Sequence, residues 1–140
     1  MQMTLAILKP DSVEAGNSGK ILAHLEQEGF KILGLRKLRL TETQAKAFYE
    51  VHKERPFYGS LVEFMTSGPV IPLALERENA VAHLREVMGA TDVAKAAPGT
   101  VRNLFGTSIE RNAIHGSDSP ENAAIELSFF FSRTELLAAQ

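Results

Sequence analysis

The sequence predicts an α+β fold in which helices cover a four-stranded antiparallel sheet. Four short apolar runs have the length of buried strands, and the segments between them carry apolar residues at helical spacing. The chain has 140 residues, of which 44% are hydrophobic and 23% are charged, so it is long and apolar enough to bury a core. No linker or repeat divides it, and one domain spanning residues 1–140 is expected.

The first predicted strand and helix lie at the start of the chain. Thr4–Leu8 is a mainly apolar run that stops before Pro10, as expected of a short buried strand. Residues 19–28 place their apolar side chains on one helical face, and they predict a helix that Ser18 caps and Gly29 ends.

A second strand is predicted over Ile32–Leu40. It carries Arg36, Lys37 and Arg39 near its far end, and such charges are typical of a strand at the exposed edge of a sheet.

Two helices are predicted next, from two pairs of residues at capping-box spacing. These pairs are Thr41 with Gln44 and Ser60 with Glu63, and the helices are expected at Thr43–His52 and Ser60–Thr66.

The third strand is predicted at Val70–Leu75. Pro72 lacks a backbone N–H, so a bulge or an interrupted ladder is expected at this residue. An amphipathic helix over Asn79–Met88 follows and ends at Gly89.

Residues 90–119 show no periodicity, and a long irregular segment within a compact domain is usually functional. Ser119 and Pro120 are the predicted cap and first residue of a short helix. Phe129–Phe131 is the predicted fourth strand, followed by a short tail over residues 133–140. This order of strands and helices is typical of a ferredoxin-like α+β sandwich.

The charge balance argues against several classes of function. Lys and Arg number 15 against 17 Asp and Glu, so the formal net charge of −2 predicts no general attraction to nucleic acid or acidic membranes. The chain has no cysteine, which excludes thiolate zinc sites and thiol nucleophiles. The N-terminal apolar run is too short for an export signal or a membrane span, so a cytoplasmic protein is expected.

No familiar nucleotide-binding loop is present. Gly19 and Lys20 resemble the end of a Walker A motif, but that motif needs glycine at Glu14 and serine or threonine at Ile21. The pair is therefore interpreted as an ordinary helix start. Dinucleotide-binding glycine triplets, protein-kinase signatures and zinc-ligand spacings are absent as well.

His115 is the strongest candidate for a catalytic residue. His24, His52 and His83 fall within predicted helices and are interpreted as solvated or partly packed side chains. His115 instead lies in the irregular segment, beside Gly116 and several polar residues. The alternative for His115 is an ordinary turn histidine.

A neutral imidazole can attack phosphorus when a second group accepts a hydrogen bond from its other ring nitrogen. Glu126 and Ser117 are the nearest candidates for that second group. Phosphoryl transfer also needs positive charge around the transition state. Lys9, Arg85 and Arg102 are the cations expected near the histidine.

Residues 112–118, Asn-Ala-Ile-His-Gly-Ser-Asp, resemble the active-site signature of the nucleoside diphosphate kinase family. Other blocks similar to that family occur in the same order and with similar spacing, so the similarity covers almost the whole chain. These blocks are Thr4–Asp11, Arg55–Tyr58, Phe64–Val70, Gly89–Thr91 and Pro98–Arg102.

The resemblance implies a ping-pong reaction in which His115 takes the γ-phosphate of a nucleoside triphosphate, mainly ATP. The diphosphate leaves, and the phosphorylated histidine then transfers its phosphate to an acceptor nucleoside diphosphate. Glu126 and Ser117 should orient His115, and Tyr49 should lie close to its ring.

The resemblance also implies which residues bind the nucleotide. Lys9 and Asn112 should reach the sugar hydroxyls, and Lys9 should also reach the transferred phosphate. The phosphate chain should be held by Arg85, Thr91 and Arg102.

The base should rest between Phe57 and Ile109. Stacking uses the face that all bases share, so broad base and sugar specificity is expected. In this family Mg²⁺ arrives bridging the nucleotide phosphates, and no protein ligands for a metal are expected.

Members of this family are homo-oligomers, either hexamers or tetramers built from dimers, and the chain resembles the short bacterial type. Pro98, ahead of Arg102, favours the hexamer. Val93 and the pair Asn103-Leu104 depart from the family pattern, which leaves the local packing of this loop open.

Two other functions remain to be separated from this one. An inactive relative that keeps the fold would be expected to have lost one of the catalytic or binding residues, and all of them are present. A phosphohistidine relay protein, charged by a partner enzyme, would not need Phe57, Thr91 and Arg102 around its histidine. Nucleotide binding therefore distinguishes the relay protein from the kinase.

Overall fold

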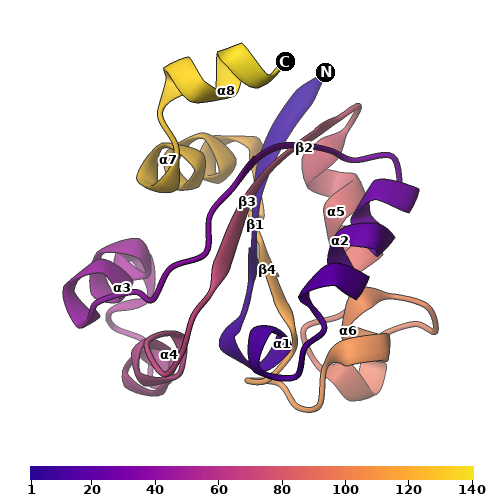
Figure 1. The fold of residues 1–140 in the computed structure, drawn as a ribbon. Helices are drawn as coiled ribbons and strands as arrows, with labels where there is room; N and C mark the ends of the chain where they lie inside the picture. The colour runs from indigo at the N-terminus through magenta and orange to yellow at the C-terminus, as the bar shows by residue number, and fades with distance from the viewer.

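The computed structural model covers residues 1–140 and contains one four-stranded antiparallel sheet with helices on both faces (Figure 1). The strands lie in the order β2-β3-β1-β4. Their bounds are β1 Gln2–Leu8, β2 Lys31–Leu35, β3 Ile71–Arg77 and β4 Ile114–Gly116. This architecture confirms the predicted ferredoxin-like α+β class.

Eight α-helices and two short 3₁₀ helices surround the sheet. The α-helices are α1 Pro10–Glu14, α2 Ser18–Gln27, α3 Glu42–Phe48, α4 Tyr58–Met65, α5 Ala80–Met88, α6 Val101–Phe105, α7 Pro120–Phe130 and α8 Arg133–Ala139; the 3₁₀ helices are η1 Glu50–His52 and η2 Val93–Lys95. No helix is both long and apolar enough to cross a membrane.

Strand β1 contributes to the core on both faces of the sheet. Ala6 and Leu8 pack with residues of α2, α5 and α6, whereas Leu5 and Ile7 pack with residues of α3, α4, α7 and α8. All four side chains are completely buried. Successive strand residues point to opposite faces, so the continuous apolar run from Leu5 to Leu8 supplies apolar side chains to both sides of the sheet.

The position predicted for the fourth strand was wrong. Phe129 and Phe130 form the last turn of α7, and the fourth strand is Ile114–Gly116, within the segment expected to be irregular. An apolar run of three residues fits either a helix or a strand. Here the helix that Ser119 caps continues to Phe130, and Phe131 packs on Gly34 of β2.

The segment expected to be irregular and the expected tail both contain further elements. η2 and α6 precede β4, and Thr100 caps α6 by accepting a hydrogen bond from the Asn103 N–H. The tail forms α8, which begins with a capping box between Ser132 and Glu135. Elements of five to seven residues are too short to leave a clear periodic signal in the sequence.

Two of the predicted helix caps were also wrong. Ser18 is the first residue of α2 and follows Asn17, which makes no side-chain capping bond. Ser60 lies inside α4, where its hydroxyl donates to the Phe57 carbonyl, and the helix begins at Tyr58. The capping box of Thr41 with Gln44 is confirmed at the start of α3.

The predicted second strand is shorter than expected, and Pro72 explains where it stops. Regular pairing of β2 with β3 ends at Leu35 opposite Leu73. The backbone N–H of Arg36 then donates to the Pro72 carbonyl. A residue of an antiparallel strand directs its N–H and its C=O to the same side, so the missing Pro72 donor faces β2. The ladder is therefore interrupted at Pro72 on that side, whereas the bulge lies in β2, between Ile32 and Gly34.

Candidate active site

Strand β4 places His115 at the edge of the sheet and on the wall of a cavity. The strand pairs with β1, with His115 opposite Ile7, and this pairing fixes the direction of the histidine. The cavity has a volume of about 420 Å³ and opens between the sheet edge, α7 and the α3–α4 connection. Most of the predicted site residues line it: Lys9, Tyr49, Phe57, Arg85, Thr91, Arg102, Asn112, His115 and Glu126.

His115 is held by one carboxylate. Its Nε2 lies 2.8 Å from Glu126 Oε1, and the same oxygen accepts a hydrogen bond from Ser117 Oγ at 2.8 Å. Because this oxygen is an acceptor, Nε2 carries the proton of a neutral ring. The lone pair of the ring is then on Nδ1, which is the ring nitrogen with the electrons to act as a nucleophile.

Two aromatic rings pack against the imidazole. The centroid of Phe48 lies 5.5 Å from that of His115 and that of Tyr49 lies 6.1 Å away, both with edge-to-face geometry. Tyr49 is buried, and burial together with nearby Glu126 raises the pKa of its hydroxyl, which therefore stays protonated. These rings restrict the orientation of the histidine from the side of α3.

Lys9 reaches the cavity from the end of β1 and is only 7% exposed. Its ammonium donates to the Asn112 Oδ1 and to the Glu110 carbonyl, both at 2.9 Å. Asn112 in turn donates to the Thr91 carbonyl, at 3.2 Å. These bonds join three of the predicted nucleotide-binding residues in one network.

Arg102 is buried and donates to three backbone carbonyls. Its guanidinium contacts the oxygens of Gly89 at 3.1 Å, Asn112 at 3.3 Å and Ile114 at 2.7 Å. Burial and the neighbouring Arg85 lower the pKa of Arg102 to about 10, so it remains a cation at neutral pH. The same side chain therefore holds the chain on both sides of Ala113 and brings positive charge to the cavity.

Phe57 and Ile109 meet across a second cavity that adjoins the first. This space, about 470 Å³, shares Lys9, Thr91 and Asn112 with the histidine cavity. Phe57 is 47% exposed and Ile109 is 62% exposed, so both apolar side chains are accessible to a ligand in this cavity. The two cavities together provide a charged end and an apolar end.

Several residues of the cavity were missed by the sequence analysis. They are Phe48, Val51, His52, Leu61, Asp118, Asn122 and Ile125. His52 was interpreted as an ordinary helical histidine, yet it lines the cavity, and its ring centroid lies 5.5 Å from that of Phe57. Its position next to the Arg55–Tyr58 block was the only available signal.

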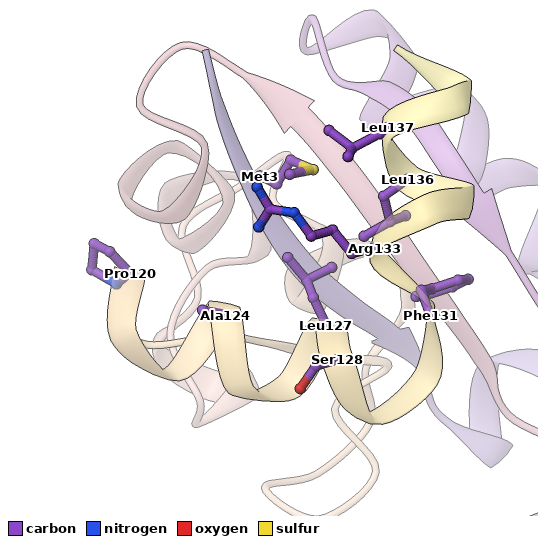
Figure 2. A pocket seen from close by; sticks show the side chains of 9 residues that line it. All are labelled: Met3, Pro120, Ala124, Leu127, Ser128, Phe131, Arg133, Leu136 and Leu137. Carbon is purple, nitrogen blue, oxygen red and sulfur yellow. The ribbon is translucent and has the colours of Figure 1, made fainter.

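Another cavity, of about 400 Å³, lies between α7, α8 and the start of β1 (Figure 2). Its polar side chains are Ser128 and Arg133, and the rest of its lining is mainly apolar. It contains no group arranged like His115 and Glu126, so the chemistry is assigned to the histidine cavity. No group of three or more His, Cys, Asp or Glu side chains is arranged to hold a metal ion.

Phosphate binding in the cavity is expected to weaken above about pH 8. Burial lowers the pKa of Lys9 from 10.5 to about 8; Arg102 adds to this effect, and Asp11 opposes it. A neutral amine attracts phosphate less than an ammonium does, so the dissociation constant for ADP should rise through this pH range.

The same shift in the pKa of Lys9 should raise the free energy of unfolding between about pH 8 and 10.5, because the unfolded chain retains the Lys9 proton in this range.

The measurement is a titration of ADP binding between about pH 6.5 and 9.5, repeated with Lys9→Arg. Arginine stays charged throughout this range, so the variant should lose the pH dependence. Equal ADP affinity of the wild-type chain at both ends of the range would contradict the low pKa of Lys9.

Comparison with known proteins identifies relatives over nearly the full length. A family model described as "Nucleoside diphosphate kinase" matches residues 2–136. The nucleoside diphosphate kinase of Geobacter sp. (strain M21) is 56% identical over 137 residues, which cover 98% of this chain and 100% of that protein. That of Persephonella marina is 52% identical and covers 98% of each.

Solved structures agree with these sequence matches. The nucleoside diphosphate kinase of Aquifex aeolicus superposes with a TM-score of 0.93 at 50% identity, over 96% of this chain and 97% of that one. A halophilic nucleoside diphosphate kinase from Halobacterium salinarum, solved in complex with CDP, has a TM-score of 0.91 at 39% identity, over 96% and 90% of the two chains.

Proposed function

The chain belongs to the nucleoside diphosphate kinase family, and from this premise we propose that His115 carries the phosphate between nucleotides. The observation that supports this role most directly is the 2.8 Å contact between His115 Nε2 and Glu126. It leaves Nδ1 as the free nucleophile on the wall of a cavity that contains three cations, Lys9, Arg85 and Arg102.

In the first half-reaction, Nδ1 attacks the γ-phosphorus of a nucleoside triphosphate, mainly ATP. A bond forms between nitrogen and phosphorus, the bond from phosphorus to the bridging oxygen breaks, and the diphosphate leaves with that oxygen. The ring becomes cationic while Nε2 keeps its proton, and the Glu126 carboxylate stabilises the positive charge. The second half-reaction is the reverse, with an acceptor nucleoside diphosphate.

Positioning and charge supply the rest of the catalysis. Lys9, Arg85 and Arg102 offset the negative charge that spreads over the transferred phosphoryl group. Thr91 contributes to the phosphate site, and Asn112 with Lys9 reaches the sugar hydroxyls. Ser117, which is fully buried, keeps Glu126 in place through its hydrogen bond.

Mg²⁺ would be held in this site by the phosphates of the nucleotide. The carboxylates on the cavity wall are Asp118 and Glu126; Glu126 bonds to His115, and Asp118 accepts from Asn122. Two separated carboxylates do not form a cage, whereas the phosphate oxygens are ligands that Mg²⁺ prefers. The ion neutralises phosphate charge when bound.

The test of the proposed function is to mix the protein with γ-labelled ATP and Mg²⁺ in the absence of an acceptor. Acid-labile label should appear on His115, bound to Nδ1, and should leave when GDP is added. Binding of ATP without labelling would favour the inactive relative. Labelling only by a partner enzyme would favour the relay protein.

Substitution of the exposed aromatic ring tests broad specificity. Phe57→Ala should weaken nucleotide binding by about 1–3 kcal/mol, with similar losses for purines and pyrimidines, because stacking uses the face of the base. Dissociation constants for ADP, GDP, CDP and UDP check this. Leu104→Ala, at an exposed apolar residue outside both cavities, is the matched control. A loss confined to one base would contradict the stacking model.

We further propose that residues 1–140 act as one domain within a cytoplasmic homo-oligomer, a hexamer or a tetramer of dimers. Family membership supports both the compartment and the assembly. β2 is an edge strand, and Leu35 on it is 48% exposed, which is compatible with contact between subunits. Light scattering at several protein concentrations distinguishes the assemblies by mass.

A further inference from the structure

Two residues before His115 the backbone makes a rare, strained turn. Ala113 has φ 76°, in the left-handed region, and the Ile114 N–H donates to the Asn112 carbonyl at 2.9 Å. A hydrogen bond between residues two apart, around a central residue with positive φ, is a classic γ-turn. A residue with a β-carbon adopts it only when its surroundings impose it.

The imposing contacts come from the start of the chain. Asp11 Oδ2 accepts the Ala113 N–H at 3.0 Å, and Ser12 Oγ donates to the Ala113 carbonyl at 2.8 Å. The Lys9 N–H also donates to that carbonyl, at 3.0 Å. Both polar backbone groups of the strained residue are thus held by residues 9–12, about a hundred positions away in sequence.

The Asp11 carboxylate has no other hydrogen bond. Its second oxygen is buried and has no partner, and it forms no ion pair within 4 Å. A buried carboxylate oxygen without a partner is costly, so the side chain is poorly explained as a stabiliser of the short helix α1. Its one bond, to a backbone N–H, is of the charge-assisted kind.

The turn lies between two parts of the active site. Asn112, on one side, accepts from Lys9 Nζ and donates to Thr91. Ile114 and His115, on the other side, pair with β1. Relaxation of Ala113 to negative φ would rotate these two parts relative to each other, and small displacements of reacting groups reduce rates strongly.

We propose that Asp11, assisted by Ser12, is a positioning residue that holds Ala113 in the γ-turn and thereby directs His115 and Asn112 into the same cavity. The inference rests on the proposed role of His115. Asp11 does not touch the nucleotide in this account and acts only through the backbone of Ala113.

The experiment measures the single-turnover rate of label uptake from γ-labelled ATP at saturating concentration. Asp11→Ala should lower the rate on the order of tenfold to a hundredfold. Asp11→Asn retains an oxygen that can accept the Ala113 N–H and should stay within about threefold of wild type. Glu14→Gln, at an exposed acid of the same helix, should leave the rate unchanged.

The decisive comparison uses Ala113→Gly, because glycine adopts positive φ without strain. In that background, the loss caused by Asp11→Ala should shrink to about threefold or less. Equal losses in both backgrounds, or a wild-type rate for Asp11→Ala, would overturn the proposal. Ser12→Ala, measured in both backgrounds, applies the same test if Asp11→Ala does not fold.

The pH profile separates this role from an effect of the Asp11 charge on Lys9. If the charge were what matters, Asp11→Asn would be as slow as Asp11→Ala, and its rate would decline at lower pH than in wild type. That result would also overturn the proposal. If the wild-type chain took no label, the proposed role of His115 would fail instead.

Discussion

His115→Ala is expected to abolish phosphoryl transfer while leaving nucleotide binding largely intact. The substitution removes the nitrogen that attacks phosphorus, and no second nucleophile on the cavity wall has a comparable carboxylate partner. The residues assigned to the base, sugar and phosphates remain. The expected loss in kcat is at least about 10⁴-fold, because a missing nucleophile removes the covalent route altogether.

Two measurements are needed for this variant: steady-state transfer from ATP to GDP, and the dissociation constant for ADP. His24→Ala provides the matched control, since His24 lies on α2 and does not line the histidine cavity. Transfer by His115→Ala within about tenfold of wild type would remove the histidine from its proposed role.

Arg102→Ala is expected to have the largest effect on stability. It removes three hydrogen bonds to the carbonyls of Gly89, Asn112 and Ile114, in a region that is almost fully buried. The Asn112 carbonyl keeps the Ile114 N–H as a donor, whereas the Gly89 and Ile114 carbonyls lose their arginine partner. Buried acceptors left without a donor each cost roughly 1–3 kcal/mol. Partial access of water reduces the sum, and a loss of about 3–5 kcal/mol in the free energy of unfolding is expected.

The same variant should also bind nucleotide poorly, because it loses a cation of the proposed phosphate site. Arg102→Lys separates the effect on affinity from the effect on stability. It restores the charge, but one ammonium cannot replace the planar guanidinium that donates to three carbonyls. Its affinity for ADP should recover more than its stability. Urea unfolding at one fixed protein concentration gives the stability, and ADP titration gives the affinity.

Arg133→Ala is the control for this pair of variants. Arg133 is exposed on α8 and makes no ion pair, so its removal should change the free energy of unfolding by no more than about 0.5 kcal/mol. An Arg102→Ala variant as stable as this control would show that the three carbonyl contacts contribute little.

Local patterns in the sequence identified most of the long elements. β1 and α5 were predicted almost to their ends, because an uninterrupted apolar run and a helical face of four apolar residues are strong signals. The cap at Ser119 and Pro120 was equally clear. His115, its candidate partners and the nearby cations were proposed from their residue types, and the remaining site residues came from the family resemblance.

Other elements depend on contacts between distant parts of the chain. β4 has only three residues, and it exists as a strand because β1 pairs with it. The three phenylalanines at the end of α7 have the composition of a strand, yet the helix continues through two of them, and the third packs on Gly34. Tertiary contacts overrule local preference in both places.

The sequence by itself determined the fold class and the burial of β1, because both are written in residue types and their periodicity, and it singled out His115 as the candidate nucleophile. Only the tertiary structure decided which segment forms the fourth strand, that Arg102 clamps backbone carbonyls, and that Asp11 holds Ala113. Those features rest on hydrogen bonds between residues at least 10 positions apart in sequence, and most of them join opposite ends of the chain. No local pattern encodes such bonds, since they form only after the sheet has brought the two segments together.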